Sequence, residues 1–240
     1  YDTEFSDLVI EDLGTQLLTN PVLDFGNVST TAGLTFSPAQ QWKWSANLSM
    51  AQRAPNPSEL FSDGLHHSAA RIELGDLRIG KETAYKASIN ALYRRDGLSV
   101  EATPFINRIS DFILLEPSGV EFTIRGAFPV WTYRQADALL RGLDLNVSNL
   151  WTAGIRSDHQ FSLVKGTDLD RDEALINMPP VNMRNAVAWS RPEWNQFTFG
   201  VESRYVFRQN EFPENIEVFS PEQNQDVLLE INTPPPAYHL

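Results

Sequence analysis

The sequence predicts an all-β protein built as the wall of an antiparallel transmembrane β-barrel. Three observations predict it: apolar and polar residues alternate, short turns alternate with long connections, and aromatic residues gather at the ends of the predicted strands. A repeat of two residues indicates a strand with two unlike faces, whereas a helix repeats every ~3.6 residues. The alternation is regular over residues 42–50, 85–93, 143–147 and 197–207.

These segments place about nine strands along the chain. We expect them near residues 2–10, 27–37, 42–52, 81–94, 98–114, 137–150, 157–165, 181–190 and 195–208, with a tenth beginning at 237–240. Gly and Pro predict short turns at residues 37–41, 94–97, 151–154 and 190–194. Long connections fall between them, at residues 51–81, 115–136, 166–180 and 209–236.

A strict alternation of short and long connections puts all short turns at one end of the sheet. That asymmetry is typical of outer-membrane barrels, whose strands need ~9–11 residues to cross the hydrocarbon layer. One face of each strand would meet lipid, and the other would face a wet lumen. The residues expected to face the lumen are Lys43, Asn47, Asp144, Asn146, Glu202 and Arg204. Aromatic girdles at the headgroup level are predicted from Phe36, Trp42, Trp44, Tyr93, Trp151, Trp189, Trp194 and Phe207.

Composition excludes several classes of function. The 240 residues carry 31 acidic and 19 basic side chains, a formal charge of −12, which argues against a nucleic-acid partner. There is no cysteine, so disulfides, thiolate metal sites and cysteine nucleophiles are excluded. We also find no G-x-S-x-G, H-E-x-x-H or phosphate-binding glycine motif, and therefore predict no enzyme, no catalytic residue, no cofactor and no resident metal.

Several short motifs follow one another in a fixed order. Their residues are Arg53, Pro55, Glu59, Leu60, Gly64, Gly75, Asp111, Gln135, Asp137, Gly142, Pro179 and Pro180. The first stretch resembles the R-x-P-x-x-x-E-L-[FY]-x-x-G-x-H segment of TonB-dependent outer-membrane receptors. The later ones resemble the family's E-x-G-N, F-x-x-x-I-x-D-[YF]-I, Y-x-Q-x-D-A…G-x-E and L-P-x-I-P-P-x-R segments, although Asp76 and Asp144 stand where Asn and Glu are usual.

The resemblance implies that residues 1–240 are part of a larger barrel. A plugged outer-membrane transporter has 22 strands, which at ~10 residues each would use about 220 residues before any loop was built. A sheet with open edges in lipid would also leave backbone groups unpaired. We therefore expect a partial barrel domain of nine to ten of the 22 strands, with the plug domain and the final strands absent from this chain.

The resemblance also implies a function. Such a receptor lies in the outer membrane of a Gram-negative bacterium, in contact with lipid and lipopolysaccharide, and imports a scarce nutrient such as a ferric siderophore, haem or another metal complex. The TonB complex of the inner membrane would act through an N-terminal region that this chain lacks. Two alternatives are a smaller outer-membrane channel or adhesin barrel, and a secreted soluble β protein that binds carbohydrate.

One extracellular connection carries candidate ligand contacts. His66 and His67, with Glu59 and Asp63 and with Glu73 nearby, combine imidazole and carboxylate groups that suit zinc or a haem iron. Organisation of the loop is the alternative role for His66, because the family segment carries G-x-H in members with different cargo. The acidic residues 168–172 are not a calcium loop, since the required Gly and Glu are absent at positions 6 and 12.

Overall fold

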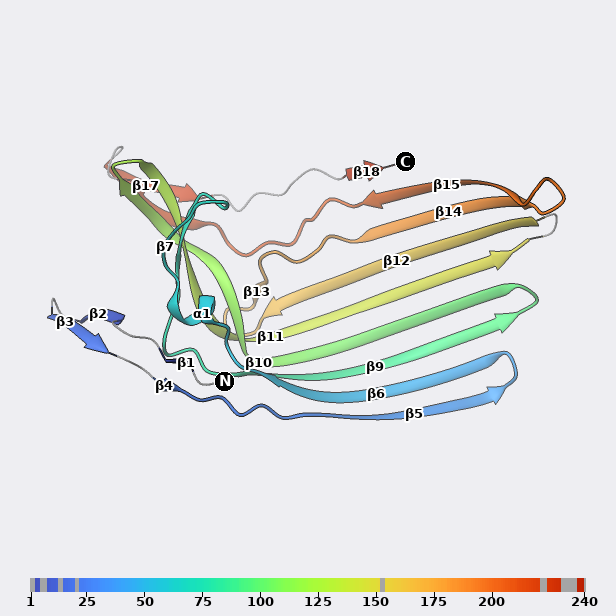
Figure 1. Ribbon diagram of the computed structural model, residues 1–240, viewed down its shortest axis with the longest axis horizontal. Helices are drawn as coiled ribbons and strands as arrows, with labels where there is room; N and C mark the ends of the chain where they lie inside the picture. The colour runs from blue at the N-terminus through green and yellow to red at the C-terminus, as the bar shows by residue number, and fades with distance from the viewer. Residues whose placement is uncertain are drawn as a thin grey trace.

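One curved antiparallel sheet makes up most of the molecule (Figure 1). The computed structural model describes residues 3–4, 8–12, 15–19, 22–151, 154–220, 224–229 and 237–239. The strands of the wall are β5 (Ser29–Ala39), β6 (Trp42–Arg53), β9 (Glu82–Arg95), β10 (Leu98–Thr123), β11 (Gly126–Leu150), β12 (Ile155–Asp168), β14 (Asn182–Arg191), β15 (Phe197–Val206) and β18 (Ala237–His239). Each pairs antiparallel with the next in that order.

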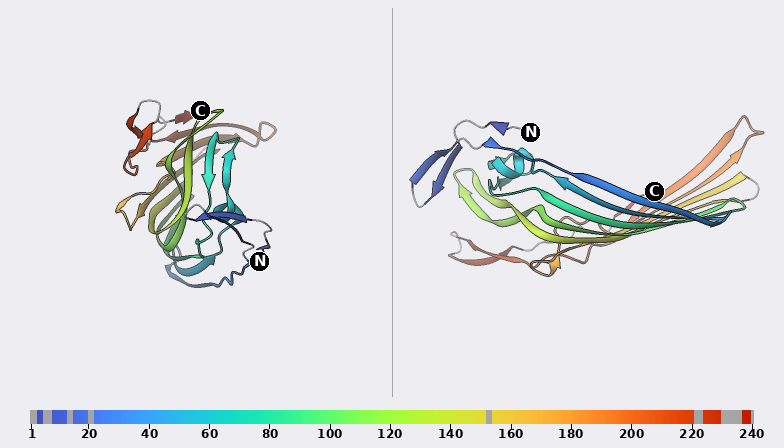
Figure 2. Two further views of the ribbon diagram at one scale, coloured as in Figure 1. Left: turned by 90° about the vertical axis from the view of Figure 1, so that its left-hand side faces the viewer. Right: turned by 90° about the horizontal axis from the view of Figure 1, so that it is seen from below.

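The wall is a single layer. Figure 2 shows its curvature from two further sides, with no second sheet stacked on the central part of the wall within the described residues. A β-sandwich would press two sheets together around a dry core, so the fold of the soluble alternative is not observed. The partial, unclosed barrel wall predicted from the sequence is confirmed.

The prediction of one continuous wall strand at residues 2–10 is wrong. Part of it lies outside the described residues, and the described parts form small separate sheets. In these, β1 (Thr3–Glu4) pairs with β4 (Val22–Leu23), and β2 (Leu8–Asp12) pairs with β3 (Thr15–Thr19). β2 and β3 pair with each other, so residues 8–12 have a local partner strand and do not join the wall. The other predicted strands and the short tenth strand are confirmed.

The long connection predicted at residues 115–136 is also wrong. β10 and β11 continue past the wall as a paired hairpin that turns at residues 124–125. We call residues 112–137 the projecting hairpin. Its pairing shifts between Ile109 and Phe112, where Asp111 has a φ of 56°. Such a bulge bends a strand and increases its twist, and Figure 1 shows the hairpin bent away from the direction of the wall.

The remaining long connections carry short elements of their own. Residues 54–81 contain α1 (Pro57–Phe61), β7 (Asp63–His66) and β8 (Arg71–Leu74), and β8 pairs in parallel with β11. β13 (Glu173–Ala174) follows β12, and β16 (Ile216–Ser220) pairs with β17 (Gln225–Leu229). These elements lie at the same end as the projecting hairpin, and the short turns lie at the other end (Figure 1). No helix in the described part of the chain is long and apolar enough to cross a membrane.

The pairing register separates two faces of the wall. Asn47, Asp144 and Glu202 lie on one face, which we call the polar face, where Ser162 donates a hydrogen bond to Asp144 (2.7 Å). The opposite, apolar face exposes aliphatic and aromatic side chains. They include Leu34, Phe36, Trp44, Leu48, Ile89, Ile106, Val187, Phe199 and Val201.

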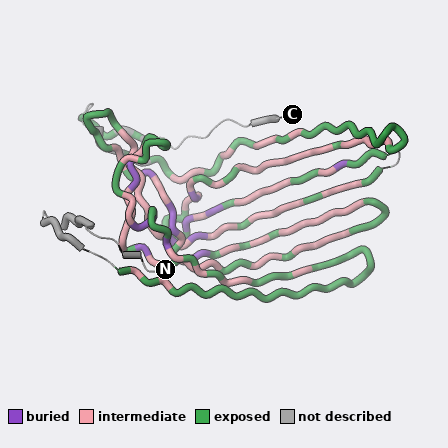
Figure 3. The backbone as a smooth tube through the Cα atoms, viewed as in Figure 1, coloured by how far each residue is buried: buried purple, intermediate pink, exposed green. Residues whose placement is uncertain are grey.

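The small core lies at the long-loop end. Figure 3 shows most of the buried residues gathered there, while the central and short-turn parts of the wall are half-buried or exposed apart from Ser157 in β12. Ile109, Leu114, Ala138 and Leu175 belong to one cluster, and Leu60, Ile79 and Ile113 form a second. Apolar burial therefore stabilises the connections, whereas the two faces of the wall are largely uncovered by other parts of the described chain.

Gly142 lies on the polar face beneath the ring of Phe105. A Cβ atom there would lie 2.5 Å from the carbonyl oxygen of Leu163 and 2.6 Å from the Phe105 ring, whereas at Gly200 the nearest atom would be 3.6 Å away. We expect Gly142→Ala to destabilise the full-length protein by ~1–3 kcal/mol, as overpacking does. Gly200→Ala, the matched control, is expected to have little effect. Guanidinium unfolding of both variants tests this, and equal midpoints would contradict it.

Candidate functional site

The connection between β6 and β9 is anchored by ion pairs at its base. Arg53, the last residue of β6, contacts Glu59 (Nη1–Oε2, 2.9 Å) and Glu82 (Nε–Oε1, 2.9 Å). Glu59 is only 7% exposed and also accepts a hydrogen bond from the backbone N–H of Asn56 (2.8 Å). With the Asn56 side chain capping α1 and Pro57 at its start, this is a capping box. The Glu59 carboxylate is therefore fully engaged in fixing α1.

The same connection closes on α1 at Gly75. The N–H of Gly75 donates to the carbonyl of Ser62 (2.6 Å), and the N–H of Asp76 donates to that of Glu59 (3.0 Å). A Cβ at position 75 would lie 2.6 Å from the Leu60 carbonyl carbon, so only glycine allows this approach. Nearby, the Arg78 guanidinium hydrogen-bonds the Asp76 carboxylate and lowers the pKa of that group.

A second clamp joins the connection to the projecting hairpin. The Gln135 side chain accepts from the N–H of Gly80 (2.9 Å) and donates to the carbonyls of Gly80 (3.0 Å) and Asp111 (2.8 Å). Asp137 accepts from Arg108 (3.1 Å) and from the N–H of Asp111 (3.4 Å). Gln135 and Asp137 thus hold the Asp111 bulge in place.

The remaining motif residues lie around these anchors. Pro55 is buried directly before α1, and Leu60 of α1 is in the core cluster with Ile113. Gly64 lies in β7 with a φ of 137°, a conformation that favours glycine. Pro179 lines a pocket at the end of β12, and the carbonyl of Pro180 accepts from the Asn182 side chain (3.4 Å).

The candidate ligand residues are separated by the fold. His66 Nδ1 lies 3.5 Å from Glu73, whose carboxylate also contacts Arg71 (2.7 Å). The Arg71 guanidinium lies 4.6 Å from the ring centroid of Trp131, so this pair is held against the projecting hairpin. His67 is exposed in the turn after β7.

Asp63 and Glu59 do not join that pair. Asp63 begins β7 opposite Leu74 and lines a pocket of about 310 Å³ between the β7–β8 hairpin and the tip of the projecting hairpin. Glu59 is held by Arg53, as described above. In the part of the chain that the structure describes, no three His, Asp or Glu side chains are grouped to hold a metal ion. The structure therefore brings together His66 and Glu73 but not the larger ligand set.

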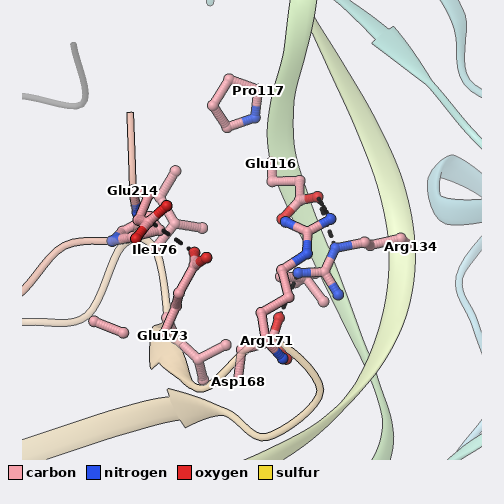
Figure 4. A pocket seen from close by; sticks show the side chains of 12 residues that line it. Glu116, Pro117, Arg134, Asp168, Arg171, Glu173, Ile176 and Glu214 are labelled. Atoms are coloured by element: carbon pink, nitrogen blue, oxygen red, sulfur yellow. Dashed lines mark hydrogen bonds and ion pairs between the residues drawn. The ribbon is translucent and has the colours of Figure 1, made fainter. Parts of the chain in front are cut away.

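A pocket of about 50 Å³ lies between the projecting hairpin and the connection after β12. Arg134 contacts both Glu116 (2.7 Å) and Asp168 (2.5 Å), and Arg171 contacts Glu116 (3.1 Å). Figure 4 shows these four side chains close together on one side of the pocket, with Glu173, Ile176 and Glu214 on the other. Because these charges are paired with one another, the arrangement ties the hairpin to the connection and contains no activated nucleophile.

The family model described as "TonB dependent receptor-like, beta-barrel" matches residues 1–240. The chain belongs to this family. Comparison with curated protein sequences found no match. The TonB-receptor barrel segment is similar to three solved structures, each of which it covers for about a third of its length.

These neighbours share the fold of the receptor segment at low identity. The copper transporter OprC is 20% identical with a TM-score of 0.67, over 88% of this chain and 30% of that one. The siderophore receptor PirA from Acinetobacter baumannii is 13% identical with a TM-score of 0.61, over 88% and 33%. The FrpB iron transporter from Neisseria meningitidis is 16% identical with a TM-score of 0.56, over 94% and 32%.

The sequence could not reveal the Arg134 network of the receptor segment. Its partners, Glu116 and Asp168, are 18 and 34 residues away, and they meet only because β10 and β11 continue as a hairpin. The acidic run at 168–172 was the one visible signal, and the sequence showed only that it is not a calcium loop. The motif residues, by contrast, were all visible, and the structure places most of them at or near the anchors of the long connections, whereas Gly142 lies within the wall.

Proposed function

We propose that this chain is part of the wall of an outer-membrane receptor that imports a scarce metal complex with energy supplied through TonB. The observation that supports this proposal most directly is that one curved sheet has an apolar face and a polar face, with the long connections all at one end. This is the arrangement of a barrel whose outside meets lipid and whose long loops face the extracellular medium.

The aromatic residues support this placement in a membrane. At the short-turn end, Trp42 stacks on Trp44 (5.8 Å between centroids) and Trp189 meets Trp194 edge-on (5.6 Å). Indole rings favour the interface because one side is apolar and the other donates a hydrogen bond. The short turns would then be periplasmic, and lipid and lipopolysaccharide would contact the apolar face.

A metal complex is the cargo class that the neighbours favour. The three neighbours are a copper transporter, an iron transporter and a siderophore receptor, and the family is one of non-enzymatic transport proteins. The candidate ligand contacts in this chain remain His66, His67, Glu59 and Asp63, of which Glu59 is the least available because Arg53 binds it. Contact with TonB itself would be made through a region that precedes this barrel segment.

Uptake by cells that carry the full-length protein tests the proposal. Hosts with and without TonB would be supplied with radioactive iron, free or as siderophore complexes, or with radioactive copper. We expect the protein in the outer-membrane fraction and accumulation of at least one of these metals only when TonB is present. Accumulation that is independent of TonB would favour a simple channel, and a soluble protein would exclude both.

A further inference from the structure

We propose that Arg108, Arg141 and Lys165 form a binding site for the phosphate groups of lipopolysaccharide in the outer leaflet. We call these three residues the cationic ridge. The inference rests on the proposed membrane placement and assigns a lipid site to particular residues of the apolar face.

The pairing register brings the three cations together. Arg141 of β11 is directly opposite Ile106 of β10 on one side and Lys165 of β12 on the other. Arg108 is two residues beyond Ile106, so it is a diagonal neighbour of Arg141, within reach of a long side chain. Ile106 belongs to the apolar face, and all three cations therefore project from that face.

The local charges are incompletely balanced. Arg108 contacts Asp137 (3.1 Å), and Lys165 contacts Glu211. Arg141 is exposed, and within the described part of the chain its guanidinium makes no hydrogen bond or ion pair. Like charges directly opposite each other, as in Arg141 and Lys165, destabilise a sheet. An anion between Arg141 and Lys165 would remove that repulsion.

The depth of the ridge identifies where that anion would come from. With a rise of ~3.3 Å per residue and a tilt of ~45°, a strand advances about 2.3 Å per residue across the membrane. Arg141, Arg108 and Lys165 are nine to ten residues from the short-turn ends of their strands. They therefore lie about 21–23 Å across an apolar band of about 25 Å, at the headgroup level of the outer leaflet.

Phosphate is the anionic group that fits this ridge. Guanidinium binds phosphate oxygens through paired N–H donors, and a neighbouring ammonium adds a point charge. A lipid is favoured over a soluble anion because the ridge borders the apolar side chains Ile106 and Leu143, which acyl chains would cover. An anionic membrane surface attracts cations in this position.

Lipid retention by the full-length receptor tests this site. The purified protein would be incubated with bisphosphorylated lipid A or with the same lipid after removal of both phosphates, and retained lipid counted by native mass spectrometry. We expect the phosphorylated form to be retained at least tenfold better, and Arg141→Gln with Lys165→Gln to abolish the difference. Arg95→Gln, an exposed arginine at the short-turn end, is the matched control and should leave retention unchanged.

Two further measurements keep the outcome unambiguous. Arg141→Lys keeps a charge and should retain part of the lipid, and heat-modifiable gel migration reports whether each variant is folded. Equal retention by the folded double variant would overturn the proposal, as would full competition by millimolar inorganic phosphate. Uptake of metal by the double variant separates the two proposals, because loss of lipid binding with intact uptake leaves the transport function standing.

Discussion

Replacement of Arg53 by methionine is expected to lower the free energy of unfolding of the full-length receptor by about 2–3 kcal/mol. The change leaves the carboxylates of Glu59 and Glu82 without their cation, while the apolar stem of the side chain is kept. Removing one partner from a buried ion pair costs ~3–5 kcal/mol, and a smaller loss of about 2–3 kcal/mol is expected here because the Arg53 side chain is 42% exposed. The side chains of Glu59 and Glu82 are 9% and 14% exposed, so water hydrates their unpaired carboxylates poorly.

Arg53→Met should also destabilise the neighbouring connection locally. Glu59 fixes α1, and the backbone N–H of Ile113 donates to Glu82 (3.1 Å), so both the 54–81 connection and the projecting hairpin depend on Arg53. We expect faster protease cleavage within residues 54–81, measured together with urea unfolding. Arg78→Met is the control, because the Arg78 side chain is 90% exposed and solvent screens its ion pair with Asp76. An equal effect of the two substitutions would refute an anchoring role for Arg53.

The strands of the wall could be predicted because a membrane wall imposes its pattern locally. Every second residue faces lipid, so alternation in residues 42–50 is visible without knowledge of any partner strand. The projecting hairpin follows another rule. Its Pro117, Ser118 and Gly119 are typical of a loop, and they become part of a strand only because residues 126–131 pair beside them. For a strand that lies outside the lipid, the local composition does not show which segment it will pair with.

The site was predictable only in part, for a related reason. Glu59 and His66 are close in sequence, but the ion pair with Arg53 turns Glu59 toward the base of the connection. His66 meets Glu73 through the β7–β8 pairing, and Arg71 stacks on Trp131, 60 residues away, through the parallel β8–β11 pairing. Contacts of this kind depend on which strands pair, and the pattern of residues along the sequence did not show that pairing.

Leu48→Arg is expected to lower the free energy of unfolding, because Leu48 lies near the middle of the apolar face. Leu48 is 64% exposed and six residues from the short-turn end of β6, about 14 Å across a band of about 25 Å. A cation at the membrane midplane costs ~2–4 kcal/mol in a barrel, since the hydrocarbon cannot hydrate it. We expect that loss in unfolding measurements on the full-length protein in phospholipid vesicles.

The adjacent position supplies the control that isolates the effect of lipid. Asn47 precedes Leu48 on the same strand and faces the opposite way, so Asn47→Arg places the same side chain at the same depth on the polar face. The two cross-strand neighbours of Leu48 are Ala32 and Ala87, which leave room for a longer side chain and exclude a steric origin for its cost. The difference between the two variants in vesicles therefore measures the unlike surroundings of the two faces. Equal costs would mean that the apolar face does not meet hydrocarbon, and the membrane placement of this wall would be refuted.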